Sequence, residues 1–204
     1  MIKNFVFDLG KVIVEFDPVE LTDKYVTDKS NLKKISEAAF SREIFDKLDS
    51  GEFTDSDGRN YLIDTFDKSL LDEALLAYDN WMNNLKVIDG MKNLIEEIKN
   101  KGYKIYLLSN VTAGFKEKYK TIDNVYEVLK NFDGLVISGD VKMIKPDKEI
   151  YEYLLNEFDL KANECIFIDD RKENTDAAIN CGLNAYTFNG DVRKLKEYIE
   201  NSIY

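Results

Sequence analysis

The chain has 204 residues, enough for one domain carrying a smaller insert, and its 44% hydrophobic and 33% charged residues indicate a globular rather than a disordered protein. The net charge is −11 and lysines alternate with acids, as in IEEIKNKGYK at 95–104, so no basic nucleic-acid-binding face is expected. Histidine is absent, which excludes Ser-His-Asp and Cys-His catalysis and histidine-ligated zinc.

Five short β-rich runs are spread along the chain, and most of them are almost wholly apolar. They predict strands at residues 5–9, 104–108, 134–138, 165–168 and 184–188. Apolar runs of this kind are typical of strands covered on both faces, as in a parallel sheet. Helical patterns, clearest at 90–100 and 147–158, separate the strands. The alternation predicts an α/β fold with a doubly wound parallel-sheet core.

Residues 17–86 interrupt this alternation and show helical patterns only. The stretch DPVE at 17–20 is typical of a helix start, with an N-cap acid followed by proline at the first helical position. Further helices are expected at 30–48, 54–66 and 69–85. We therefore expect a core formed by residues 1–16 and 87–204 that carries an all-helical insert at 17–86.

The two cysteines, Cys165 and Cys181, have no zinc-ligand spacing and form no disulfide framework, which favours a reduced, cytoplasmic protein. The N-terminal segment lacks the layout of a signal peptide, and no apolar run reaches the length of a membrane span. No oligomeric signal stands out, and a monomer or weak homodimer is expected.

Polar residues follow the predicted strands, where open α/β sheets bind their ligands. They are Asp8 and Gly10 after the first strand, Ser109 and Asn110 after the second, Lys145 in the loop after the third, and Asp169 and Asp170 after the fourth, with Asn174 nearby. Taken singly, most could be helix N-caps or solvated side chains. Asp8 is different, because an unpaired carboxylate beside a buried strand is costly.

Together these residues suit phosphoryl transfer. Three carboxylates with an amide fit Mg²⁺, which prefers hard oxygen ligands. Ser109, with the backbone N–H groups of the helix expected after it, and Lys145 suit the oxygens of a phosphate. A carboxylate nucleophile can form an acyl phosphate, and Mg²⁺ offsets the repulsion between that nucleophile and an anionic substrate.

The order of four motifs resembles that of the haloacid dehalogenase-like (HAD) hydrolases. The motifs are FVFDLGKVIV, YLLSN, MIKPDKEIY and CIFIDDRKENTDAA, and the resemblance spans residues 4–178. The helical insert after the first motif is similar to the C1 cap of subfamily I. The form DLGKV resembles a branch of sugar-phosphate phosphatases with a DLGxV first motif.

The resemblance implies a role for each residue. Asp8 is the expected nucleophile, and Ser109 and Lys145 are expected to hold the transferring phosphoryl group. Mg²⁺ is expected on Asp8, Asp170 and the carbonyl of Gly10, with Asp169 in support. Asn110 is expected to orient the nucleophile or line the pocket, and Asn174 stands where many members carry a further acid. The cap is expected to close over a small phosphorylated metabolite, such as a hexose 1-phosphate.

Gly10 departs from the family pattern, because many of these phosphatases carry an acid there that donates and accepts a proton. Three interpretations stay open. Water, Lys11 or the cap protonates the leaving group; or the leaving group, such as an anomeric oxygen, needs little help; or the protein is a slow enzyme or a degenerate phospholigand-binding module.

Other chemistries fit the motifs less well. A 2-haloacid dehalogenase-type hydrolase would need no Mg²⁺ and would leave Asp169 and Asp170 without a role. In the insert, Trp81, Arg42 and Phe45 are candidates to face a substrate. Aromatic residues at helical spacing, namely Phe40, Phe45, Tyr61 and Phe66, are more typical of the insert's own core.

Overall fold

The structure, a computed structural model, describes residues 1–203 and is built on a five-stranded parallel sheet. The strands are β1 (Asn4–Phe7), β2 (Lys104–Ser109), β3 (Gly134–Ile137), β4 (Cys165–Asp169) and β5 (Asn184–Thr187). Their order is β3-β2-β1-β4-β5, so β1 lies in the centre, between β2 and β4. The predicted doubly wound α/β fold is confirmed, and every predicted strand overlaps an observed one.

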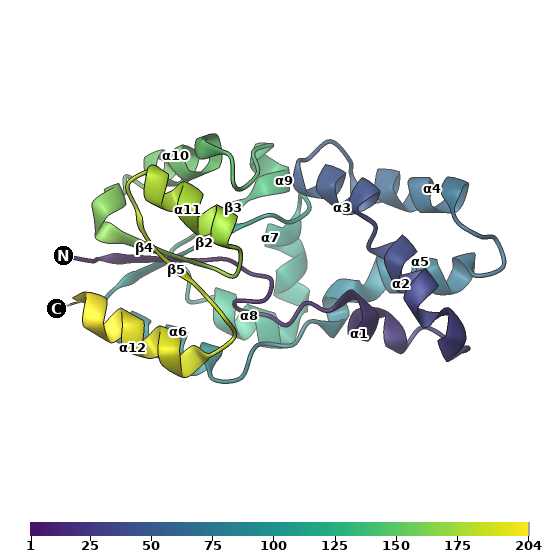
Figure 1. Ribbon diagram of the computed structural model, residues 1–204, viewed down its shortest axis with the longest axis horizontal. Helices are drawn as coiled ribbons and strands as arrows, with labels where there is room; N and C mark the ends of the chain where they lie inside the picture. Colours follow the sequence, from purple (N-terminus) through teal and green to yellow (C-terminus); the bar gives the residue numbers. More distant parts are fainter. Residues whose placement is uncertain (204) are drawn as a thin grey trace.

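Helices cover both faces of the sheet (Figure 1), so the central strands bury side chains on both faces, whereas β5, at the edge, has exposed residues at both its ends. One face packs against α6 (Met91–Asn100), α8 (Asp123–Leu129) and α12 (Val192–Ile203). The other packs against α10 (Lys148–Glu157) and α11 (Lys172–Asn180). Along β1, Phe5 and Phe7 belong to the first of these two clusters and Val6 to the second.

Short elements surround the carboxyl ends of the strands. They are the helices α7 (Phe115–Lys118) and α9 (Ser138–Val141) and a 3-10 turn at Tyr119–Thr121. Another 3-10 turn, Ala162–Glu164, precedes β4. Within residues 1–203, none of the helices combines the length and the apolar character needed to cross a membrane.

The helices that follow β1 and precede α6 gather at the carboxyl ends of the strands, away from both chain termini (Figure 1). They are α1 (Pro18–Asp23), α2 (Leu32–Ala39), α3 (Arg42–Asp49), α4 (Asp55–Thr65) and α5 (Leu71–Asn80), with 3-10 turns at Lys29–Asn31 and Trp81–Asn84. Apolar side chains such as Ile35, Ile44 and Leu62 form a separate cluster among these helices. The group therefore has a core of its own.

Local signals set the ends of these helices. The carboxylate of Asp17 accepts hydrogen bonds from the backbone N–H groups of Val19 and Glu20, as the sequence predicts for the start of α1. The single helix expected over residues 30–48 is in fact two, because Ser41 adopts an extended conformation before α3. The change of direction at Ser41 turns α3 toward the sheet, where it contacts α9.

Candidate active site

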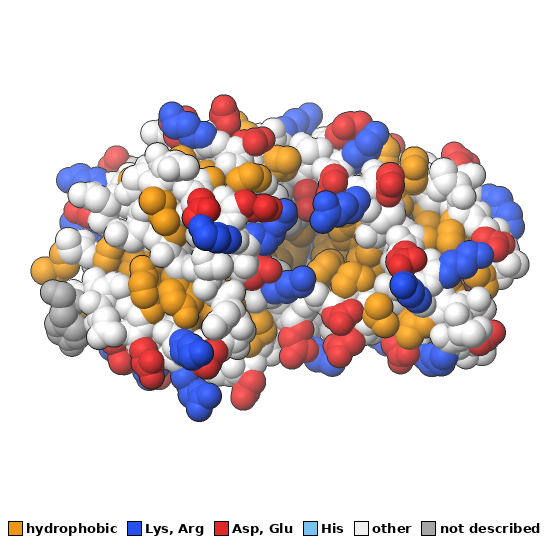
Figure 2. All heavy atoms as spheres, viewed as in Figure 1, with side chains coloured by type: hydrophobic (Ala, Val, Ile, Leu, Met, Phe, Trp, Pro, Cys, Tyr) orange, Lys and Arg blue, Asp and Glu red, His pale blue; other side chains and the backbone are white. Residues whose placement is uncertain are grey.

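A cavity of about 270 Å³ lies between the sheet and the helices α1–α5. Figure 2 shows a hollow near the middle of one face, with hydrophobic side chains at its floor and charged ones at its rim. Of the residues singled out in the sequence, the cavity is lined by Asp8, Gly10, Ser109, Asn110, Lys145, Asp170 and Asn174. They meet because parallel strands bring their carboxyl ends to one edge, beside the central strand.

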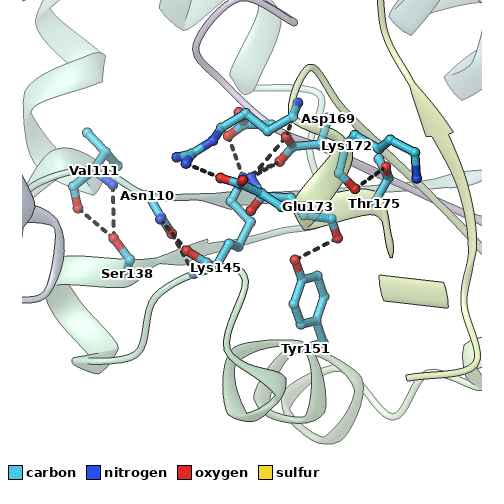
Figure 3. A network of polar contacts seen from close by, with 12 residues as sticks. Asn110, Val111, Ser138, Lys145, Tyr151, Asp169, Lys172, Glu173 and Thr175 are labelled. Atoms are coloured by element: carbon cyan, nitrogen blue, oxygen red, sulfur yellow. Dashed lines mark hydrogen bonds and ion pairs between the residues drawn. The ribbon is translucent and has the colours of Figure 1, made fainter. Parts of the chain in front are cut away.

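Lys145 is the centre of the polar network at this edge (Figure 3). Its ammonium lies 2.8 Å from Oδ1 of Asp8 and 2.6 Å from Oδ2 of Asp169, and all three side chains are buried. The sequence alone left Lys145 with a solvated-lysine alternative, which this burial excludes. One ammonium therefore compensates two carboxylates inside the protein.

Asn110 holds the backbone of Lys145 in place. Its side-chain amide donates to the carbonyl of Lys145 and accepts from the N–H of the same residue, both at 2.9 Å. This two-way contact fixes the loop after β3 against the end of β2. Asn110 thus lines the cavity, as expected, and also positions the lysine.

Asp169 lies beneath the cavity, fully buried at the end of β4. Its carboxylate accepts from the side-chain amide of Asn174 at 3.0 Å, from the backbone N–H of Arg171 at 2.8 Å, and from Lys145. Asn174 is itself buried, and its Oδ1 has no hydrogen-bond partner within residues 1–203. Asn174 therefore acts on Asp169, and its free oxygen remains available to a water or an ion.

The donor set fits a hard divalent cation. Asp8, Asp169 and Asp170 each offer a carboxylate oxygen, and these oxygens lie within 4.8 Å of one another. Within residues 1–203, Lys145 pairs with Asp8 and Asp169 whereas Asp170 forms no ion pair, and Mg²⁺ would add positive charge among the three carboxylates. Asp170 is the more accessible of the two acids after β4, whereas Asp169 is saturated with donors.

The electrostatic environment shifts the pKa values of these groups. Burial raises the pKa of Asp8 to about 6, although the ammonium of Lys145 opposes the shift. Burial, and next the charge of Asp169, raises the pKa of Asp170. For Lys145, burial acts to lower the pKa, but the charges of Asp8 and Asp169 prevail and hold it above its usual value. A bound cation would relieve the strain on the carboxylates.

The first loop carries no acid beside Asp8, but it leaves space for one. A Cβ on Gly10 would meet only Cβ of Phe16, at 3.9 Å. The next residue, Lys11, lines the cavity and has a left-handed backbone with φ of 58°. Such a conformation is uncommon for lysine, and strained residues of this kind cluster at functional sites.

The roof of the cavity is aromatic. Phe16, Phe40, Phe45 and Trp81 line it and contact one another, with ring centroids 5.2–6.3 Å apart. Phe40 and Phe45 also pack against the cluster of the helical group, as do Tyr61 and Phe66, which were expected in its core. Arg42, a candidate in the sequence, does not line this cavity.

Asp49, at the end of α3, also lines the cavity, and sequence reasoning did not single it out. The sequence did contain a clue to Asp49, because an acid in the last turn of a helix interacts unfavourably with the helix dipole. Arg171, which follows the two acids of β4, was likewise not assigned a role and lines the same cavity.

Comparison with known proteins agrees with this geometry. The profile of the haloacid dehalogenase-like hydrolase family matches residues 2–182. The chain belongs to this family. It is therefore a hydrolase, and the family membership predicted from the four motifs is confirmed.

Two relatives align along most of their own length. A sesquiterpene phosphatase from Aspergillus oryzae is 25% identical, covering 89% of this chain and 87% of the relative. A D-ribitol-5-phosphate phosphatase from Bacteroides thetaiotaomicron is also 25% identical, covering 91% of each chain.

Solved structures share the fold. A HAD family enzyme from Bacteroides thetaiotaomicron, in a complex with magnesium and inorganic phosphate, superposes with a TM-score of 0.70 at 23% identity, covering 93% of this chain and 96% of that one. L-2-haloacid dehalogenase from Xanthobacter autotrophicus superposes with a TM-score of 0.65 at 19% identity, covering 91% and 76%.

Proposed function

We propose that this hydrolase is a Mg²⁺-dependent phosphatase that hydrolyses a small phosphorylated metabolite through an aspartyl-phosphate on Asp8. The observation that carries the proposal is the grouping of the Asp8, Asp169 and Asp170 carboxylates, two of which, Asp8 and Asp169, pair with the buried ammonium of Lys145. Such a site offers a nucleophile, a cation site and a fixed positive charge within one cavity. The two phosphatase relatives support the same reaction class.

Each residue then has a distinct task. Asp8 attacks phosphorus, and Lys145 and Ser109 hold the oxygens of the transferring group. Asp8, Asp170 and the carbonyl of Gly10 would hold Mg²⁺, which supplies charge compensation for nucleophile and phosphate. Asp169, saturated by three donors, keeps Lys145 and the acid after it in place.

We assign residues 17–86 to a cap that covers the substrate and excludes water. The separate apolar cluster of the helical group supports this boundary. The ring faces of Phe45 and Trp81 in the cavity suit the non-phosphate part of the substrate, either a sugar ring or an apolar chain. A sugar phosphate such as a hexose 1-phosphate is one such substrate, and phosphorylated terpenoids belong in the same test.

The three carboxylates also separate this function from 2-haloacid dehalogenation. That reaction uses an aspartate nucleophile but needs no cation, and the grouping of Asp169 and Asp170 with Asp8 would then have no role. A degenerate binding module would keep the phosphate cradle without turnover.

The test is hydrolysis of p-nitrophenyl phosphate and of a panel of sugar and terpenoid phosphates with Mg²⁺. We expect EDTA to abolish activity and Asp8→Asn to remove it without unfolding the protein. Asp17→Asn, which changes an acid outside this cavity, is the matched control and should retain activity. Full turnover by Asp8→Asn would exclude Asp8 as the nucleophile, and a wild type that binds phosphate without any turnover would favour the binding module.

A further inference from the structure

On the core side of the site, none of the carboxyl groups is free to give a proton to the leaving oxygen of a phosphate ester, and Lys11 of the first loop is the alternative donor there. Gly10 has no side chain, and the ammonium of Lys145 is shared between Asp8 and Asp169. The carboxylate of Asp169 already accepts hydrogen bonds from Arg171 and Asn174, and Asp170 is placed to hold a cation. An alkoxide is a poor leaving group, so a proton has to come from Lys11 or from another element that faces the cavity.

We propose that Asp49, at the end of α3 in the cap, is the acid that protonates the leaving oxygen and the base that then activates water. The inference rests on the proposed phosphatase function and adds a catalytic residue to it. Asp49 lines the same cavity as Asp8 but approaches from the opposite wall, the helical group. In an in-line displacement the leaving oxygen lies on the far side of phosphorus from the nucleophile, which here is the side of the cap.

The carboxyl group of Asp49 has no structural partner. Within residues 1–203 the side chain of Asp49 forms no hydrogen bond and no ion pair, although the residue is partly buried. The other acids of α3, Glu43 and Asp46, are exposed. A partly buried, unpaired carboxyl group that opposes its own helix dipole contributes nothing evident to stability, and its location in the cavity gives it a chemical use instead.

The environment of Asp49 favours its protonated form. Burial raises its pKa to about 7, and the charges of Asp46 on the same helix and of Asp8 after β1 add to the shift. Lys145 in the loop after β3 and Arg171 after β4 oppose it. The two negative charges of a bound phosphate ester act in the same direction as Asp8. A carboxyl group that titrates near neutral pH is suited to both giving and taking a proton.

A close backbone contact fixes α3 over the site. Gly51, just after this helix, has φ of 70°, and a Cβ there would lie 2.5 Å from the carbonyl oxygen of Gly139 in α9. A Cβ on Gly139 would in turn lie 3.0 Å from the carbonyl oxygen of Leu48. Two glycines thus let the end of α3 pack against the core, next to Asp49.

A second contact joins the cap to the core nearby. Asp55, at the start of α4, accepts a hydrogen bond from the hydroxyl of Thr112 at 3.0 Å and forms an ion pair with Lys118. Because α3 and α4 are both held to the core, Asp49 keeps its place above the carboxyl ends of the strands. A proton donor needs this kind of positioning.

The proton balance is complete within two steps. A carboxylate oxygen of Asp8 forms a bond to phosphorus, the bond from phosphorus to the ester oxygen breaks, and that oxygen keeps the electron pair and takes the proton of Asp49. The alcohol then leaves. Water next attacks the phosphorus of the aspartyl-phosphate and gives one proton to the Asp49 carboxylate, and its hydroxide stays on phosphorus. The bond from phosphorus to the Asp8 oxygen breaks, and the electron pair returns to the Asp8 carboxylate. Inorganic phosphate leaves, and Asp8 and Asp49 return to their starting forms.

The experiment compares substrates that differ in their need for a proton. p-Nitrophenolate leaves readily as an anion, whereas an alkyl phosphate such as glycerol 3-phosphate requires protonation. For Asp49→Asn we expect kcat/KM on glycerol 3-phosphate to fall by on the order of 10²-fold, the lower end of general acid catalysis, with only a few-fold change on p-nitrophenyl phosphate. A burst of p-nitrophenolate should appear, since loss of the base slows hydrolysis of the aspartyl-phosphate.

The controls separate the possible causes. Glu43→Gln removes one negative charge from the exposed face of the same helix and should leave both substrates unchanged. Asp49→Ser, a second variant, should reproduce the selective loss. An equal loss on both substrates, or no loss on either, overturns the role of Asp49 while the phosphatase function stands. A wild type without hydrolysis of any phosphate ester overturns the phosphatase function, and the role of Asp49 with it.

Discussion

Oδ1 of Asp8 lies 2.8 Å from Nζ of Lys145, and both side chains are almost entirely buried. The same ammonium also contacts Asp169, so its removal would leave two buried carboxylates without a counter-charge. Breaking a buried ion pair from one side is far more costly than its presence is stabilising. The stability of the protein and the charge of the site therefore depend on the same residue.

We expect Lys145→Met to abolish phosphatase activity and to lower the free energy of unfolding by about 3–5 kcal/mol, as measured by urea denaturation. Lys148→Met, which removes an exposed lysine paired with Glu152, should cost no more than about 0.5 kcal/mol. Adding Asp169→Asn to Lys145→Met should recover part of the stability. Equal losses for the two lysine variants would contradict the buried-pair account.

Asn174 offers a test of the metal site that does not need turnover. Its amide donates to both carboxylate oxygens of Asp169 at 3.0 Å, so Asn174→Asp replaces a donor by a like charge. We expect this variant to have a lower Tm than wild type in EDTA, and a larger rise in Tm when Mg²⁺ is added. Asp176→Asn, on the exposed side of the same helix, is the control. Identical responses to Mg²⁺ would argue against a cation beside Asp169.

The sequence predicts the sheet well because strands buried on both faces leave continuous apolar runs, such as CIFI in β4. It also predicts that the polar strand ends meet, since parallel topology alone brings Asp8, Ser109 and Asp170 to one edge. The buried network is harder to foresee. Nothing in the order of residues reveals that Asn174 donates to Asp169 or that Asn110 holds the backbone of Lys145.

The cap is the least predictable part, because helical periodicity gives a helix face but not its partner. Phe45 packs in the cap cluster and at the same time lines the cavity, so it serves both of the uses that its spacing left open. Asp49 reaches the cavity only because Ser41 turns the chain before α3 and two glycines let that helix approach the core. Such a close approach depends on tertiary packing that local patterns do not encode.

Asp49 should also leave a mark on stability. Its pKa rises from 3.8 to about 7 on folding, so the folded protein binds more protons than the unfolded chain between these values. The free energy of unfolding therefore falls as the pH rises through this window. Asparagine does not titrate, and Asp49→Asn should be more stable than wild type at about pH 8 by on the order of 1–2 kcal/mol, after allowance for solvent screening.

The measurement is thermal unfolding in EDTA across pH. A gain of about 1–2 kcal/mol corresponds to roughly 2–4 °C in Tm for each kcal/mol in a domain of this length. It should vanish well below pH 3.8, where Asp49 is protonated in both the folded and the unfolded state. Glu43→Gln, on the exposed face of α3, should show no such dependence. If Asp49→Asn raised the stability by the same amount at every pH, folding would not raise the pKa of Asp49.

Gly10 supplies the last test, because the structure leaves space for a side chain at the place where many family members carry the proton-transferring acid. A Cβ there meets only Cβ of Phe16, at the ordinary contact distance of 3.9 Å. In the Asp49→Asn background, we expect Gly10→Asp to restore at least a tenth of the kcat/KM on glycerol 3-phosphate that Asp49→Asn loses. The new aspartate would thereby replace part of a general acid effect of roughly 10²-fold. Gly10→Asn, of the same size but without a proton to give, should restore none. The wild type, which has Gly10 and Asp49, should be active without this substitution. If the aspartate and asparagine variants restore activity equally, the gain comes from filling the cavity rather than from a proton.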